Sequence, residues 1–258
     1  MAAISFDRAA DFYDASRSLP DDVHHLLTTV LATELGRRSL CLEIGVGTGR
    51  IALPLAAAGV RLVGVDIAPK MLQRLVANAG GRQPFPISVA DVTALPFDAV
   101  AFDAVIASHL LHLIPEWGRA VDEAVRVLRP GGAFLVDFGG GAPSPWNESM
   151  RAVLREHGVD RARPGMSDPG PVADHLSGRA RARPLPPLTM TVRRSLGQDL
   201  ADTRAQINSW TWSASAEQIA AACDALRQWA ADNGWPLDRQ VELHRTIQWW
   251  AFDIAESP

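Results

Sequence analysis

The feature of this chain that most constrains its fold is the short run Glu43-Ile44-Gly45-Val46-Gly47-Thr48-Gly49. It ends an apolar stretch, residues 39–44, that is typical of a central strand in a parallel sheet. The three glycines let the backbone turn tightly and approach a ligand closely, because no Cβ stands in the way. Residues 50–58 then have a helical composition that ends at Gly59, with Pro54 in the first turn. The run therefore predicts a strand, a tight turn and a crossover helix.

Two classes of ligand use such a turn, and the spacing of the glycines distinguishes them. A dinucleotide fingerprint has the form G-x-G-x-x-G and aims the helix N-terminus at a pyrophosphate. Here the third glycine, Gly49, comes one position early, and Arg50 stands where the fingerprint has glycine. Glu43 adds a physical objection, because a carboxylate within about 4–6 Å of a phosphate repels it in a partly desolvated site. The same carboxylate suits a ligand with an ammonium and a sulfonium group, such as S-adenosylmethionine. A turn that binds nothing is the remaining alternative.

A second apolar stretch, residues 60–66, also ends in an acid, Asp66. This acid lies about twenty residues beyond the glycine turn, where a carboxylate can accept hydrogen bonds from ribose hydroxyls. A helix is predicted to follow at residues 68–79, with Pro69 near its start. The spacing fits a dinucleotide and S-adenosylmethionine equally well, so it indicates a nucleoside without naming it.

A third acid, Asp91, follows a predicted strand at residues 86–90 and precedes Leu95-Pro96-Phe97. With this landmark the chain resembles the class I S-adenosylmethionine-dependent methyltransferases, in particular the small-molecule group of the type 11/25 kind. The pattern of that group is E-x-G-x-G-x-G, then G-x-D-x-S/A-x-x-M-L, then D-x-x-x-L-P-F. The matching segments are residues 43–49, 64–72 and 91–97. The resemblance continues through a strand at 102–108 and a helix-to-strand turn at 123–132.

The resemblance implies a fold, a cofactor and a set of contacts. The fold is α/β: a doubly wound, seven-stranded, mostly parallel Rossmann-like sheet in the order 3-2-1-4-5-7-6, with helical cap additions. The cofactor is S-adenosylmethionine, with no metal. Asp91 would accept a hydrogen bond from the adenine amine, and the Val92 N–H would meet a ring nitrogen. The cofactor-binding residues that the resemblance implies are Tyr13, Glu43, Gly45, Gly47, Gly49, Asp66, Ile67, Met71, Asp91, Val92 and Ser108.

Four segments are expected within one methyltransferase domain at residues 1–258. Residues 1–37 would form N-terminal helices and a lid, with the second helix starting at Pro20-Asp21-Asp22, and residues 38–138 would form the cofactor-binding core. Residues 139–187 open with three glycines, are rich in arginine and proline, and would form a mobile cap with a helix at 146–157. Residues 188–258 would complete the sheet with strands at 188–194 and 240–250, and with a helix at 216–232.

Candidate catalytic groups follow the predicted fourth strand. His109 and His112 lie just past its carboxyl end, where a reacting group would stand beside the cofactor. Histidine is the side chain best suited to act as a base near neutral pH, although a packing role in the loop is the alternative. Tyr13 has two interpretations, a lid contact or a chemical role.

Large aromatic side chains gather in the last part of the chain. Seven of the eight tryptophans lie beyond Gly139. Trp146, Trp210 and Trp212 fall in or beside predicted loops and are candidates for a substrate pocket, with core packing as the alternative.

The composition of the chain limits the kinds of molecule to which it is expected to bind. The net charge is −4, from 25 basic and 29 acidic residues, so the whole chain has no electrostatic attraction for nucleic acid or an anionic membrane. Two cysteines are too few for a disulfide framework, and there is neither a signal-peptide core nor an apolar run near the ~20 residues that span a bilayer. We therefore expect a cytoplasmic enzyme with a small-molecule methyl acceptor. An NAD-dependent oxidoreductase and a non-catalytic S-adenosylmethionine-binding accessory domain remain as alternatives.

Overall fold

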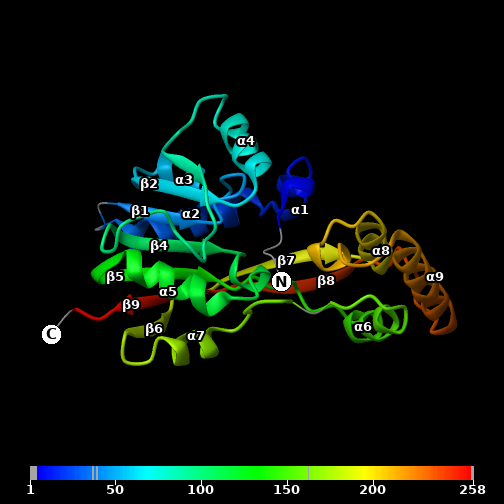
Figure 1. Ribbon diagram of the computed structural model, residues 1–258. Helices are drawn as coiled ribbons and strands as arrows, with labels where there is room; N and C mark the ends of the chain where they lie inside the picture. Colours follow the sequence, from blue (N-terminus) through cyan, green and yellow to red (C-terminus); the bar gives the residue numbers. More distant parts are fainter. Residues whose placement is uncertain (1–4, 37, 39, 162, 257–258) are drawn as a thin grey trace. The chain divides into compact units, whose positions relative to one another are not determined.

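Seven strands form the main sheet of the computed structural model, in the order β3-β2-β1-β4-β5-β9-β6 (Figure 1). The structure describes residues 5–36, 38, 40–161 and 163–256, so Ser39 of the predicted first strand lies outside the described residues. Strands β1 to β5 pair in parallel, whereas β9 is antiparallel to β5 and to β6. The expected fold class and strand order are confirmed, with β9 in the place of the seventh strand. The strands of this sheet are β1 (Cys41–Ile44), β2 (Leu62–Asp66), β3 (Ile87–Val89), β4 (Phe102–Ser108), β5 (Leu128–Asp137), β6 (Ala180–Pro184) and β9 (Trp249–Ile254).

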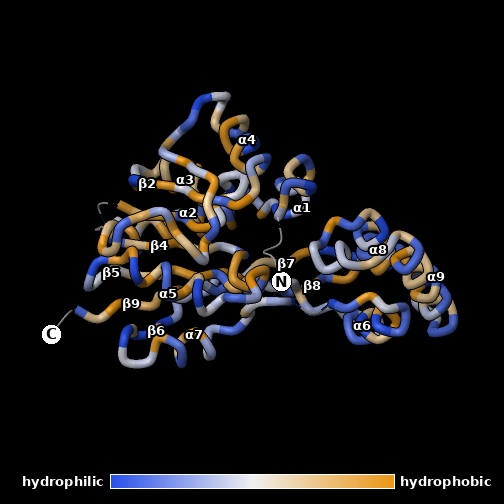
Figure 2. Tube along the Cα trace, viewed as in Figure 1, coloured by the Kyte–Doolittle hydropathy of each residue, from blue (hydrophilic) through white to orange (hydrophobic). Residues whose placement is uncertain are grey.

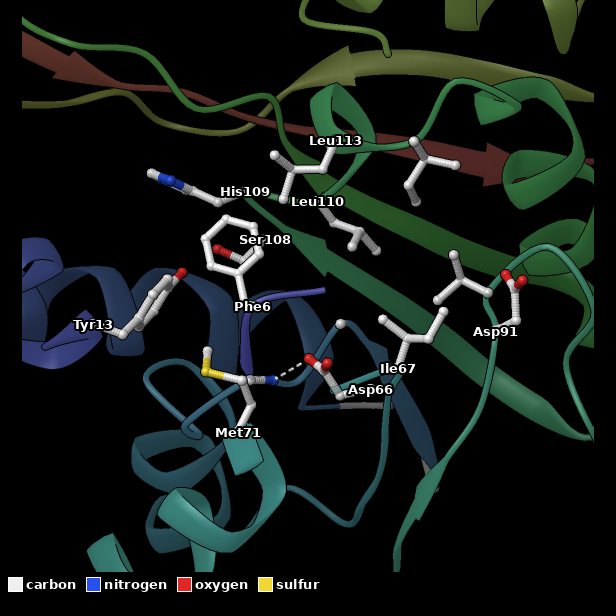
Figure 3. A pocket seen from close by; sticks show the side chains of 14 residues that line it. Phe6, Tyr13, Asp66, Ile67, Met71, Asp91, Ser108, His109, Leu110 and Leu113 are labelled. Carbon is white, nitrogen blue, oxygen red and sulfur yellow. Dashed lines mark hydrogen bonds between the residues drawn. The ribbon is translucent and has the colours of Figure 1, made fainter. Parts of the chain in front are cut away.

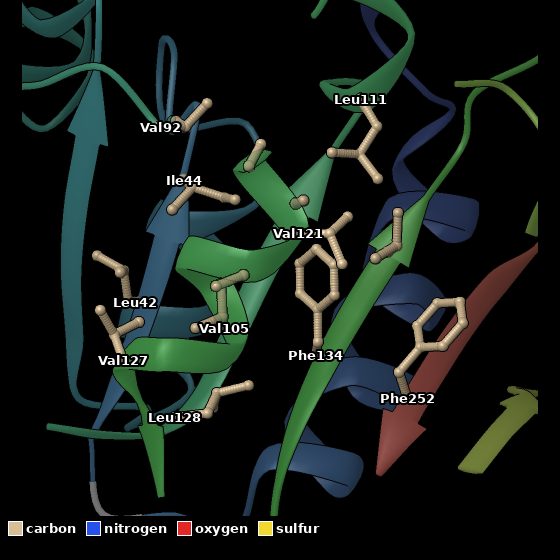
Figure 4. Close-up of a cluster of buried hydrophobic side chains, with 14 of the residues drawn as sticks. Leu42, Ile44, Val92, Val105, Leu111, Val121, Val127, Leu128, Phe134 and Phe252 are labelled. Carbon is tan, nitrogen blue, oxygen red and sulfur yellow. The ribbon is translucent and has the colours of Figure 1, made fainter. Parts of the chain in front are cut away.

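Helices cover both faces of the main sheet. Helix α5 lies on one face and α2 on the other (Figure 4). The buried residues of α5, among them Ala120, Val121 and Ala124, recur three or four positions apart and pack against Leu42 and Val105 of the strands. Hydrophobic residues run along the central strands (Figure 2), which are buried on both faces. The helices and 3-10 turns of this part are η1 (Asp7–Ala9), α1 (Tyr13–Arg17), α2 (Asp21–Leu35), α3 (Ala52–Ala57), α4 (Pro69–Asn78), η2 (Leu111–Leu113), α5 (Trp117–Val127) and α7 (Pro169–His175).

The chain divides into two compact units. The first, which we call the sheet unit, comprises Met1–Gly139, Pro164–Leu188 and Ile247–Pro258; the second, the helical unit, comprises Gly140–Arg163 and Thr189–Thr246. The helical unit has its own core, to which Leu154, Leu196 and Leu226 contribute. Its elements are α6 (Asn147–Glu156), α8 (Leu196–Arg204), η3 (Ser209–Thr211) and α9 (Ala216–Asp232), with β7 (Leu188–Arg194) and β8 (Val241–Ile247) in a separate two-stranded sheet. None of the helices in the described part of the chain is long and apolar enough to cross a membrane.

The expected cap at residues 139–187 is not one segment. Its first part, with α6, belongs to the helical unit, and its second part supplies β6 at an edge of the main sheet. Two of the arginines that suggested an irregular surface, Arg181 and Arg183, belong to this edge strand, where charged side chains are common. Arg183 forms ion pairs with Glu34 and with Asp253 of β9, at 2.5 and 2.6 Å. The high proline and arginine content of residues 139–187 therefore led to the prediction of an irregular segment where the structure has the strand β6.

The expected completion of the main sheet by residues 188–258 is also wrong in part. The strands at 188–194 and 241–247 pair with each other, and only β9 joins the main sheet. The single strand predicted at 240–250 is interrupted at Gln248, whose side-chain amide donates to the carbonyl oxygens of Leu185 and Trp249. A continuous run of strand-forming residues thus contributes to two sheets.

Candidate active site

The turn after β1 has the backbone shape that its glycines predict. Gly45 and Gly47 have φ angles of 68° and 56°, in the left-handed region that side chains with a Cβ disfavour. A Cβ at Gly45 would also lie 2.7 Å from Cδ1 of Leu110. Gly49 shares the positive φ, but a Cβ there would meet Leu53 at 2.7 Å. Gly45 and Gly47 therefore keep a cradle open, whereas Gly49 allows the first turn of α3 to pack.

A cavity of about 650 Å³, partly open to solvent, lies at the carboxyl ends of the parallel strands (Figure 3). Residues in the turns after β1, β2, β3 and β4 line this cavity. In open α/β sheets, ligands bind in a crevice at this position, outside the carboxyl ends of the strands. The predicted site residues that line it are Tyr13, Gly45, Gly47, Asp66, Ile67, Met71, Asp91, Val92, Ser108 and His109.

The carboxylate of Asp66 is fixed by the backbone at the end of β2. Its Oδ2 accepts from the Gly47 N–H at 2.9 Å, and its Oδ1 accepts from the Ala68 N–H at 2.8 Å. Burial raises the pKa of Asp66, and these two N–H groups oppose the rise. Each oxygen keeps a second lone pair, so a hydroxyl pair of a ligand can still donate to this carboxylate.

Glu43 is the buried carboxyl of the site. It is 2% exposed, and its Oε2 has no hydrogen-bond partner among the described residues. Burial raises the pKa of Glu43 to about 8, against the positive charge of Arg50 and with the added repulsion of Asp66. A second cavity of about 230 Å³ is lined by Glu43, Arg50, Tyr13 and Ser108, among others. Native proteins rarely leave such an atom unpaired, and a cationic group in this second cavity would pair it.

Asp91 lies on the opposite side of the cavity from Tyr13 and His109 (Figure 3), and Val92 also lines the cavity. The Oδ1 of Asp91 accepts from both the N–H and the hydroxyl of Thr93, at 2.8 Å each. This turn orients the carboxylate, while Val92 is buried.

His109 is held by Asp137 at the ends of β4 and β5. Its Nε2 lies 3.0 Å from Oδ2 of Asp137, and its backbone N–H donates to the Asp137 carbonyl at 3.1 Å. Burial alone would raise the pKa of Asp137, but His109, the Gly139 N–H and Arg50 together lower it. His109 itself has a φ of 51°, which is uncommon for a residue with a Cβ.

His112 lies in η2 and does not line either described cavity. Its ring meets that of His109 edge-on, with centroids 6.4 Å apart. Its carbonyl accepts the N–H of Gly165, which attaches the segment before α7 to this turn. Of the two candidate bases, the structure places only His109 on the cavity wall.

The N-terminal segment contacts the cavity through residues 5–17 of the predicted lid; residues 1–4 and 37 lie outside the described residues. Phe6 and Tyr13 line the cavity and pack edge-to-face, with ring centroids 5.9 Å apart. Asp14 accepts from the Thr48 hydroxyl at 2.5 Å and from the Asn78 amide at 2.9 Å. This carboxylate therefore ties the segment to both the glycine turn and α4.

The three candidate pocket tryptophans lie in the helical unit, and none lines the two cavities described above. Trp146 is 1% exposed, and its Nε1 donates to Asp199 at 2.7 Å, which corrects the expectation of a pocket role: it is a core residue. Trp210 packs against the same core with the Arg161 guanidinium 4.9 Å above its ring. Trp212 donates from Nε1 to the Gln206 carbonyl at 2.8 Å.

Sequence reasoning missed several residues of this site. Asp137 is the last residue of β5, so the strand-end rule that selected His109 could also have found it. The other missed residues that line the larger cavity are apolar and carry no motif; they are Phe6, Leu110, Leu113 and Ile114.

Comparisons with known proteins indicate a family and a fold. Residues 42–136 match a family described as "Methyltransferase domain". A sterol 4-C-methyltransferase from Caenorhabditis elegans is 38% identical over 106 residues, which are 40% of this chain and 32% of that protein. A demethylmenaquinone methyltransferase from Clavibacter sepedonicus is 35% identical over 136 residues, which are 51% of this chain and 55% of that protein. The chain thus spans about a third and about half of these relatives.

One solved structure shows the same fold over most of the chain. The YcgJ protein from Bacillus subtilis has a TM-score of 0.59, over 91% of this chain and 100% of that protein. At 19% sequence identity this likeness concerns the fold alone.

Proposed function

Residues 42–136 form a domain of the methyltransferase family, and from this premise we propose that the chain transfers a methyl group from S-adenosylmethionine to a small-molecule acceptor. The observation that carries the proposal is the unpaired, buried Oε2 of Glu43 beside the Gly45–Gly47 cradle. Two relatives are named for a sterol and for demethylmenaquinone, both small molecules, which supports an acceptor of that size.

The residues present fit the cofactor. Glu43 offers an acceptor to a cationic group, and Asp66, oriented by two backbone N–H groups, offers lone pairs to a ribose. Asp91 and Val92 offer an acceptor and a donor to adenine. A pyrophosphate would instead meet the acidic groups Glu43 and Asp66, which disfavours a dinucleotide. When bound, S-adenosylmethionine supplies a methyl group already activated by the adjacent positive sulfur.

The chain's own task is mainly positioning. An activated methyl group needs an acceptor held in line with it in a closed, dry site, and such positioning can account for about 7–11 kcal/mol of a barrier. Phe6, Leu110 and Leu113 supply apolar cover beside the glycine turn. His109 is the favoured candidate for any proton transfer, and His112 is the weaker one because it does not line the cavity.

Ligand binding separates this proposal from its alternatives. In a thermal-shift and calorimetry panel, S-adenosylmethionine and S-adenosylhomocysteine should stabilise the protein, by about 2.7 kcal/mol at 100 times the dissociation constant. NADH should not. Stabilisation by NADH alone would replace the proposal with an oxidoreductase.

A variant tests the ribose contact directly. Asp66→Ala should weaken S-adenosylmethionine binding roughly 10- to 150-fold, because a hydrogen bond to a charged group contributes about 1.5–3 kcal/mol. The exposed Glu156, changed to Gln, is the control for loss of one charge. Equal affinity in the Asp66 variant and the control would refute the ribose assignment. Tight binding without turnover on any acceptor would favour a non-catalytic role.

A further inference from the structure

We propose that Arg161, on the loop after α6, is the centre of a binding site in the helical unit for a phosphate group, either on a phosphorylated small molecule or as free phosphate. The Arg161 guanidinium lies against Trp210 and Asn147, and it forms no ion pair with a carboxylate in the part of the chain that the structure describes. All three residues belong to the helical unit. The inference therefore does not depend on the proposed methyl transfer.

The loop after α6 is fixed by its backbone and by one buried side chain. Gly158 has a φ of 73°, and the Val159 N–H donates to the Leu154 carbonyl at 2.8 Å, as in the common glycine-terminated end of a helix. Val159 is 1% exposed and belongs to the same core as Leu154. The chain therefore turns back, and Arg161 reaches Asn147, the first residue of α6.

The Arg161 guanidinium is half-buried and keeps most of its donors for a ligand. Its Cζ lies 4.9 Å from the centre of the Trp210 ring, so the ring covers one face of the guanidinium. Nη1 donates to Oδ1 of Asn147 at 3.2 Å, and within the described residues the side chain forms no other hydrogen bond. A guanidinium has five N–H donors in a planar fork, so most of them remain available to an acceptor that lies in this plane.

The positive charge of Arg161 is not neutralised by a neighbour. Asp199 acts on it, but the oxygens of Asp199 are already engaged: Oδ1 accepts from Arg194 at 2.6 Å, and Oδ2 accepts from an indole N–H at 2.7 Å. Arg151 and Arg163 bring further positive charge. Burial lowers the pKa of Arg161, and these two arginines lower it further, against the effect of Asp199. Because a half-buried cation among like charges is costly, a negatively charged ligand would be stabilising here.

Several other half-buried arginines pair with carboxylates, as is usual for a structural role. Arg194, in the same unit, meets two carboxylates at 2.6 Å each, and Arg183 of β6 also meets two. Arg50 forms no such pair among the described residues, and it lines the second cavity of the candidate active site. In the sheet unit, a half-buried arginine without a carboxylate thus lies where a ligand is expected, and Arg161 shares this feature.

A phosphate group fits this arrangement better than other anions do. The planar fork of the guanidinium matches two oxygens of a phosphate or of a carboxylate. A phosphate monoester carries about −1.5 to −2 charges near neutral pH, whereas a carboxylate carries a single charge. Arg151, Arg161 and Arg163 together therefore attract the phosphate more strongly.

Nitrogen NMR and calorimetry of the full-length protein test the site directly. The Nε–H signal of Arg161, assigned by its loss in Arg161→Gln, should shift saturably with phenyl phosphate and with inorganic phosphate, less with benzoate, and not with phenol. Arg161→Gln should weaken phenyl phosphate binding roughly 10- to 150-fold, because hydrogen bonds to charged groups are the stronger kind. Arg155→Gln is the matched control, since it removes an exposed arginine of α6, and it should change the affinity less than about threefold.

Urea unfolding separates a ligand site from a structural role. Arg194→Gln loses two ion pairs and should unfold at a clearly lower urea concentration than wild type. Arg161→Gln has no ion pair to lose within the described residues, so its unfolding midpoint should fall less. Phenyl phosphate should raise the midpoint of wild type and of Arg155→Gln but not that of Arg161→Gln, because only a folded protein with the site gains from binding.

Equal affinity of wild type and Arg161→Gln for phenyl phosphate, or no saturable shift of the Arg161 signal with either phosphate, would overturn the proposal. Tighter binding of benzoate than of phenyl phosphate would overturn the phosphate class. Tighter binding of phenyl phosphate than of inorganic phosphate would support the site and assign it to a phosphorylated small molecule. The reverse order would support the site and assign it to free phosphate.

Discussion

Replacing Glu43 by Gln should make the free protein more stable at neutral pH while it weakens cofactor binding. Burial raises the pKa of Glu43 from its ordinary value of 4.5 to about 8 in the folded protein. Between these two values the folded chain keeps a proton that the unfolded chain releases, so stability falls as the pH rises through this window. Below pH 4.5 both states are protonated, and the whole contribution of this carboxyl to stability is present.

The magnitude follows from the width of the window. Each pH unit inside it removes up to about 1.4 kcal/mol, so wild type should lose at most about 3 kcal/mol between pH 5 and pH 7 through this group. That is a large share of the roughly 5–15 kcal/mol by which domains are stable. Gln cannot ionise, so the variant lacks this loss.

Urea unfolding at pH 5, 6, 7 and 8 measures the effect as the difference in unfolding free energy between Glu43→Gln and wild type. This difference should grow with pH up to pH 8, whereas the difference for the exposed control Glu156→Gln should stay flat. A Glu43→Gln difference that stays constant within about 0.5 kcal/mol from pH 5 to pH 7 would refute the reasoning.

The ionisation of Glu43 should also make cofactor binding depend on pH. A cationic group beside Glu43 stabilises the carboxylate, so S-adenosylmethionine should displace a proton below pH 8 and bind more tightly as the pH rises from 6 to 8. Calorimetry in two buffers of different ionisation enthalpy counts the proton. Glu43→Gln should bind more weakly and release none from this site.

Three further predictions address the turn, the N-terminal segment and the helical unit. Gly45→Ala should lower stability by about 1–3 kcal/mol, because its φ of 68° strains any residue with a Cβ; an unchanged melting temperature would contradict this. Asp14→Ala removes the contact with Thr48 and should speed S-adenosylhomocysteine dissociation several-fold in stopped-flow measurements; an identical rate would argue against a lid. Trp146→Phe loses a bond to Asp199 and should reduce the unfolding free energy by about 1.5–3 kcal/mol in urea; a smaller loss would mean that the bond contributes little.

Many of the residues that line the larger cavity could be predicted because their signals in the sequence are local. The glycine turn, Asp66 and Asp91 each end or follow a short apolar strand, and parallel strands bring their carboxyl ends to one edge of the sheet. Helices with clear capping residues could also be predicted from the sequence. Helix α9 spans the predicted residues 216–232, and Ser215 at its N-terminus forms a capping box with Gln218.

Sheet membership in the last third could not be predicted in the same way. The strand at 188–194 has the predicted bounds, yet it pairs with β8 and not with the main sheet. A strand pattern in the sequence indicates which residues adopt an extended conformation, but it does not identify the strand with which they pair. That pairing depends on contacts between segments far apart in sequence. In the edge strand β6, likewise, Arg183 pairs with Glu34 and Asp253, which are both more than sixty residues away in the chain.

The sequence by itself determined the tight glycine turn after β1, because that turn depends on neighbouring residues, and the order of the central strands was expected from the resemblance of its motifs to the class I methyltransferases. Only the tertiary structure decided which polar groups face one another. Asp137 meets His109 because the register of β4 and β5 sets two strand ends together, and Trp146 is a core residue because a distant Asp199 satisfies its N–H. Local propensity carries no information about such pairs, since they form only when the chain has packed.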